Sequence, residues 1–70
     1  MESKVEAQVI GMRTEEAADR VRGRLECMTG VDLVETCIRT GQVNVYGHDL
    51  ERDDVYDALR EIGCETLIRD

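Results

Sequence analysis

The 70-residue chain contains no proline, no low-complexity segment and no run of 18 apolar residues. Without a proline-rich linker or a clear repeat, we expect one domain over residues 1–70. A chain this short buries only about 60% of its unfolded surface, so any function should lie on a surface, loop or interface. No membrane span is expected, and Met1–Val5 lacks the start of a secretory signal, which predicts a cytoplasmic protein.

Basic residues are scarce, with 9 Lys plus Arg against 16 Asp plus Glu, a net charge of -7, and Lys4 is the only lysine. Phosphate groups are bound by basic surfaces, so the composition argues against nucleic acid and against a membrane surface as partners. An acidic surface with arginine in place of lysine suits high ionic strength, where salt screens the repulsion between like charges. We therefore hypothesise a halophilic source.

Cysteine and histidine are also few: Cys27, Cys37, Cys64 and His48. An odd number of unclustered thiols should stay reduced in the cytoplasm. Cys27 and His48 give only two ligands without a short spacing, so we expect no zinc site. Cys37 is expected on an open sheet face, either as an inert thiol or as the link in oxidised dimers. With no triad and no phosphate-binding glycine loop, the chain is not expected to be an enzyme.

The spacing of apolar residues predicts six elements. Alternation with period 2 predicts strands, and spacings of three and four predict helices. The order is strand, helix, strand, strand, helix, strand, which predicts an α+β ferredoxin-like βαββαβ sandwich with a four-stranded antiparallel sheet and two helices on one face. The strands are expected at 4–10, 31–39, 43–46 and 66–68, and the helices at 14–30 and 52–63.

Short polar residues and glycines set the expected ends of these elements. Thr14 should cap the first helix, and Gly30 and Gly63 should end the two helices in left-handed conformation. The third strand should break over Gly47-His48-Asp49.

The segment Gly11-Met12 before the first helix, with the glycines and apolar residues that follow it, resembles the heavy-metal-associated domain of copper chaperones and metal-transporting ATPases. The resemblance runs from about Val5 to Cys64, and it implies the fold given above and the binding of a soft metal ion such as copper. The matching positions are Val21, Leu25, Met28, Gly30, Val31, Val34, Val43, Val45, Gly47, Val55, Ala58, Leu59 and Gly63.

The family's metal motif is Gly-Met-x-Cys-x-x-Cys, and here Thr14 and Ala17 stand at the two cysteine positions. Neither side chain can replace a thiolate, so tight two-thiolate chelation is excluded. The resemblance places Cys64 beside the metal loop, where its thiolate and the Met12 thioether can bind a soft ion weakly, or two chains can share an ion through paired Cys64. Alternatively, Cys64 is a half-buried filler and Met12 a core residue.

Two functions remain open. The first is a heavy-metal-associated-like binding module with weak or altered soft-metal binding at Met12 and Cys64. The second is a protein-protein interaction or self-association module without a metal function, docking a partner or a second copy on an edge strand or on the open sheet face. Only Arg13, as an anion binder, supports a third possibility, an acyl-phosphate hydrolase. The open face is expected to carry Ile10, Leu33, Cys37 and Tyr46.

Overall fold

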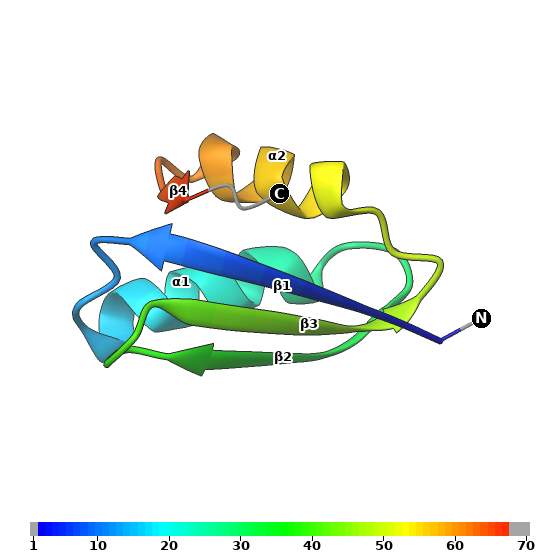
Figure 1. Cartoon of the computed structure of the whole chain (residues 1–70), viewed down its shortest axis with the longest axis horizontal. Coiled ribbons are helices and arrows are strands. Elements are labelled where there is room, and N and C mark those ends of the chain that lie inside the picture. Colours follow the sequence, from blue (N-terminus) through cyan, green and yellow to red (C-terminus); the bar gives the residue numbers. More distant parts are fainter. Residues whose placement is uncertain (1, 68–70) are drawn as a thin grey trace.

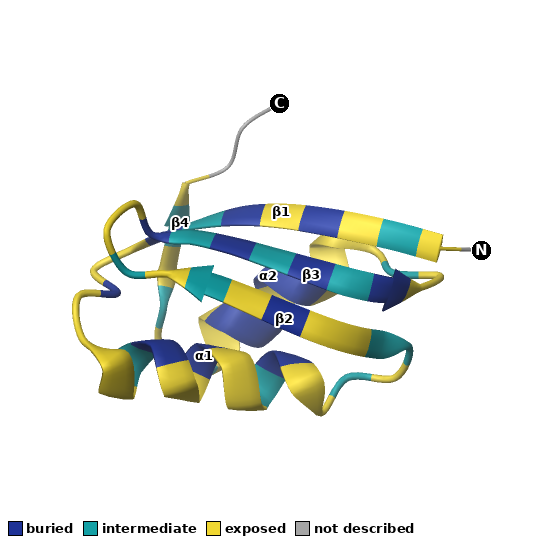
Figure 2. Ribbon diagram, turned by 90° about the horizontal axis from the view of Figure 1, so that it is seen from below, coloured by how far each residue is buried: buried dark blue, intermediate teal, exposed yellow. Residues whose placement is uncertain are grey.

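The computed structural model describes residues 2–67, which form four strands and two helices. The strands make one sheet in the order β2-β3-β1-β4, and both helices cover the same face of it (Figure 1, Figure 2). This confirms the predicted ferredoxin-like sandwich, although Ile68 of the expected last strand lies outside the described residues. The elements are β1 (Glu2–Ile10), α1 (Glu15–Glu26), β2 (Val31–Cys37), β3 (Gln42–His48), α2 (Arg52–Glu61) and β4 (Glu65–Leu67).

The central strands pair over most of their length, and the two outer strands differ in extent. β1 pairs with β3 from Glu2 opposite His48 to Gln8 opposite Gln42. β4 pairs with β1 only along Gln8–Ile10. The edges of the sheet are therefore the seven-residue β2 and the three-residue β4.

The core lies between the sheet and the helices, as the alternation in β1 predicts. Val5, Ala7 and Val9 are buried against the helices, whereas the residues between them face the open side of the sheet. One apolar row on each helix completes this layer. The buried partners are Met12, Ala18, Val21, Leu25, Val34, Val43, Val45, Val55, Tyr56, Ala58 and Leu59.

The start of α1 was predicted correctly and its end was not. Thr14 caps the helix, because its Oγ1 accepts a hydrogen bond from the Ala17 N–H at 3.1 Å. The helix stops at Glu26, and Gly30, with φ +88°, lies in the turn before β2 rather than at a helix cap. The early ending lets the Gly30 carbonyl accept a hydrogen bond from the His48 N–H at 2.8 Å.

The third strand was predicted to break over Gly47-His48-Asp49, and it breaks at the last of these residues rather than at Gly47. Gly47 pairs with Ser3 on one side and Val31 on the other, and β3 continues to His48. The chain turns instead at Asp49, which has φ +55°. The strand continues because the missing side chain lets β3 pass close to the Gly30 backbone.

Gly23 lies in the middle of α1 without a structural reason for being glycine. It is exposed, and a Cβ there would meet no atom within 4 Å. Because glycine in a helix interior is less favourable than alanine, we expect Gly23→Ala to raise the free energy of unfolding by about 0.5–1 kcal/mol in urea denaturation. Gly11→Ala is the matched control: its Cβ also meets open space, but φ +87° strains alanine, so stability should fall. A decrease for Gly23→Ala would contradict the expectation.

Candidate metal site at the loop pole

Three connections meet at one end of the molecule, here called the loop pole: the β1–α1 loop, the β2–β3 turn and the α2–β4 turn (Figure 1). The Val9 N–H donates to the Gly41 carbonyl of the β2–β3 turn at 2.8 Å. Ile10 pairs with Glu65 at the start of β4. Gly11 follows Ile10 and Cys64 precedes Glu65 in this antiparallel pair, so Cys64 continues opposite Gly11 at the entrance to the β1–α1 loop.

The β1–α1 loop retains its frame but has no thiol. Gly11 makes the turn with φ +87°, and Met12 points into the core with 4% of its surface exposed. Thr14 is occupied as the helix cap, and Ala17 packs half-buried against the core. The two positions where the family has cysteines therefore serve only to start α1.

Cys64 lies just after α2, in a turn set by the helix end. The Gly63 N–H donates to the Arg60 carbonyl and the Cys64 N–H to the Leu59 carbonyl, both at 3.0 Å. These two bonds, with Gly63 at φ +81°, form a Schellman motif, so Gly63 ends the helix as predicted. Cys64 is a free thiol, half-buried against the core. It fits a single thiolate ligand, and the pair of thiolates that chelates a soft ion is missing.

Cys37 differs from the other thiols because of a neighbour that the sequence analysis missed. It is exposed at the end of β2, and a hydrogen bond from the Thr40 hydroxyl, helped by backbone N–H groups, lowers the pKa of its thiol. The signal in the sequence was a threonine three residues after the cysteine within an expected tight turn. Cys37 is therefore the main competitor of Cys64 for a thiol-seeking ion at the loop pole.

Cys27 and His48 lie at the opposite end of the molecule. Cys27 is exposed at the C-terminal cap of α1. The His48 imidazole Nε2 lies 3.3 Å from a carboxylate oxygen of Asp32. Within residues 2–67, no three His, Cys, Asp or Glu side chains are grouped so as to hold a metal ion.

This opposite end, here called the acidic pole, is rich in acids, since seven of them lie at or beside the ends of the elements there. Repulsion among these charges is strongest at low ionic strength. The acids are Glu2, Glu26, Asp32, Asp49, Glu51, Asp53 and Asp54.

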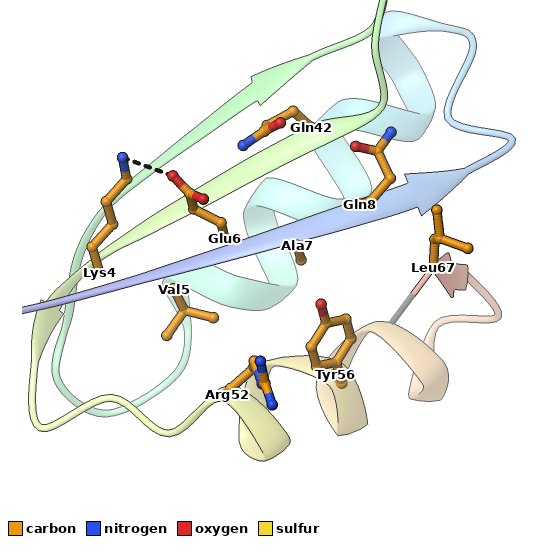
Figure 3. Close-up of a pocket in the computed structure, with 9 residues that line it drawn as sticks. All are labelled: Lys4, Val5, Glu6, Ala7, Gln8, Gln42, Arg52, Tyr56 and Leu67. Carbon is orange, nitrogen blue, oxygen red and sulfur yellow. Dashed lines mark ion pairs between the residues drawn. The ribbon is translucent and has the colours of Figure 1, made fainter. Parts of the chain in front are cut away.

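A shallow hollow beside β1 lies apart from the candidate metal site. Within the described residues it is lined by β1, β3, α2 and β4. Figure 3 shows the Tyr56 side chain reaching from α2 toward β1, and an ion pair of 3.0 Å between Lys4 and Glu6. No thiol lines this hollow, so it adds no ligand for a soft metal.

No protein-family model and no curated protein matches the chain. Solved structures do match it. The structure titled oxidized MerP from Ralstonia metallidurans CH34 is 19% identical with a TM-score of 0.88, each chain covered completely. The CopZ metallochaperone is 24% identical with a TM-score of 0.88, and the match covers 93% of this chain and all of that one. The chain has the heavy-metal-associated fold.

A third match extends the likeness to a transporter domain. A copper binding domain from HMA7, a P-type ATPase, is 19% identical with a TM-score of 0.83, covering 97% of this chain and 96% of that one. The resemblance predicted from Gly11-Met12 and the apolar positions is thus confirmed for the fold. None of the helices within residues 2–67 is both long and apolar enough to span a membrane.

Proposed function

We propose that this chain is a heavy-metal-associated-like binding module that holds a soft metal ion of the Cu(I) type weakly, through the single thiolate of Cys64. The observation that carries the proposal is the pairing of Ile10 with Glu65, which sets Cys64 opposite Gly11 at the entrance to the β1–α1 loop. A thiolate is the ligand that soft ions prefer. The matches to a metallochaperone and to a copper binding domain of the same fold support a metal-binding role.

We expect low affinity because the residues of the β1–α1 loop near Cys64 offer no accessible second ligand. Thr14 and Ala17 give no thiolate, so the ion loses the chelation that two cysteines provide. Met12 can add its thioether only by leaving the core, where it is 4% exposed. Exposing a buried methionine side chain costs about 1.5–3 kcal/mol, a factor of roughly 10 to 100 in affinity. Two chains that share one ion through paired Cys64 avoid this cost, and a stoichiometry of one ion per two chains would reveal them.

Competition between the reduced protein and a Cu(I) chelator tests the role of Cys64. We expect Cys64→Ser to lower the affinity at least about tenfold, because the variant removes the proposed thiolate. Cys27→Ser, at the opposite end of the molecule, is the matched control and should bind as the unsubstituted chain does. Equal affinity of the unsubstituted chain and Cys64→Ser would overturn the proposal.

The second candidate is an interaction module, and the length of the β2 edge favours it. The open face of the sheet is mixed: Ile10 and Leu33 are 52% and 51% exposed, but polar side chains lie between them. Tyr46 lies between Lys4, whose Nζ is 5.5 Å from the ring centre, and Glu35, whose hydrogen bond raises the pKa of Tyr46. The unpaired backbone groups along the β2 edge are therefore a better binding surface for a partner, or for a second copy in a homodimer, than the open face. Neither candidate includes a catalytic step.

A further inference from the structure

We propose that the outer edge of β2 docks a second copy of this chain, with the two β2 strands antiparallel about a twofold axis so that both sheets join into one. The inference is independent of metal binding at Cys64. It concerns the side of the molecule where β2 lies above α1 (Figure 2).

Within the described residues β2 is the longer edge of the sheet, with seven residues against three in β4. Its sequence contains neither lysine nor proline, two residues that commonly block strand addition. A register irregularity interrupts it only at its start, between Val31 and Leu33. From Leu33 to Cys37 the strand is a regular template for another strand.

β2 carries two acids, and each lies beside a side chain of its own sheet. Asp32 lies 3.3 Å from the His48 imidazole, which is charged only when protonated. Glu35 raises the pKa of the neighbouring Tyr46 hydroxyl, an uncharged group. Neither neighbour carries a fixed positive charge, so both acids add to the repulsion between two copies. The other charged groups closest to an approaching strand are those of the groove between α1 and β2.

This groove points to a second copy as the occupant because its charge is balanced. It is lined by two acids, Glu15 and Asp19, and two bases, Arg22 and Arg39. A strongly basic partner would gain nothing from a neutral groove, and it would be drawn to the acidic pole instead. The groove is where two chains of net charge -7 approach each other with the least repulsion.

Asp19 and Arg22 form an ion pair of 2.5 Å within α1, so the groove presents both signs of charge to a second copy. The exposed side chain of Leu33 beside the edge loses contact with water when the two copies join.

Salt should strengthen this dimer. The remaining repulsion comes from the acidic poles and from the two acids of β2, and it acts over about 10 Å at 0.1 M salt but about 3 Å at 1 M. Backbone hydrogen bonds and Leu33 burial are not screened in this way. Salt therefore weakens the charge repulsion between the copies and leaves the backbone hydrogen bonds and the burial of Leu33 in place.

Sedimentation velocity of the reduced protein with a metal chelator present, at about 0.1 M and about 1 M KCl, tests the inference. The dimer fraction should rise with salt. Leu33→Glu should weaken dimerisation about tenfold or more by adding an acid at the edge. Ile10→Glu is the matched control, with equal exposure at the far side of the sheet, and should dimerise as the unsubstituted chain does.

Circular dichroism of both variants would establish that each is folded. A chain that stays monomeric at both salt concentrations, or a Leu33→Glu variant that dimerises like Ile10→Glu, would overturn the inference. Because no metal is present, these results are separate from the outcome of the Cu(I) competition with Cys64→Ser.

Discussion

Introducing Thr14→Cys together with Ala17→Cys is expected to raise the affinity for Cu(I) on the order of a thousandfold, about 4 kcal/mol. The two positions are close together at the first turn of α1, since the Thr14 Oγ1 lies 3.1 Å from the Ala17 backbone nitrogen. A helix N-terminus lowers the pKa of thiols and stabilises a negatively charged metal complex. The frame of a tight site is present, and only the ligands are missing.

The measurement is the same chelator competition with the reduced double variant. Thr14→Ser with Ala17→Ser is the matched control, since it has the size and polarity of the double cysteine variant without sulfur, and it should not gain affinity. Loss of the threonine cap costs the cysteine variant about 1 kcal/mol of stability, which thermal unfolding without metal would reveal. If both double variants bound Cu(I) equally, the loop would not have the geometry that we assign to it.

Gly47→Ala is expected to lower the free energy of unfolding by about 3 kcal/mol. A Cβ at Gly47 would overlap the carbonyl oxygen of Gly30 and lie 3.0 Å from the Cα of Val31. Both contacts are with backbone, so no side chain can move aside. Overpacking of this kind costs about 1–3 kcal/mol, and pushing the strands apart also weakens the 2.8 Å bond between the His48 N–H and Gly30.

Thermal unfolding followed by circular dichroism would measure this loss, as a Tm lower by roughly 12–24 °C for a domain of this size. Gly23→Ala is the control with the same chemical change in open space, and its Tm should rise. A Tm for Gly47→Ala within about 4 °C of the unsubstituted protein would show that β3 does not need the close approach.

Local signals in the sequence were enough for most of the fold. The alternation of Val5, Ala7 and Val9 identified the buried side of β1. The hydroxyl of Thr14 and the conformational freedom of Gly63 identified one end of each helix, because a cap depends only on residues within a few positions. These features are decided by neighbours along the chain.

The two differences from the predicted element ends concern a contact between segments distant in sequence. Gly30 and Gly47 each look like local breaks, but their backbones approach each other across the turn before β2 and the end of β3. That approach ends α1 early and carries β3 beyond Gly47. Sixteen residues lie between Gly30 and Gly47 in the sequence, so no short-range pattern predicts this contact.

The candidate site was predictable in what it lacks. Thr14 and Ala17 at the family's cysteine positions are visible in the sequence alone. The burial of Met12 depends on how the β1–α1 loop packs, and no spacing predicts it. The effect of Thr40 on Cys37 is local, and its signal was the threonine three residues after the cysteine in the expected turn. The structure thus makes Met12 a less accessible ligand than the sequence suggests, and it adds Cys37 as a competitor of Cys64 for a metal ion.

An NMR chemical-shift map of the reduced, isotopically labelled protein with and without Cu(I) tests most directly whether a weak site remains at the loop pole. We expect shifts confined to Cys64 and the β1–α1 loop, including Gly11 and Thr14. The absence of shifts, or shifts centred on Cys27 or Cys37, would contradict a metal site at Cys64.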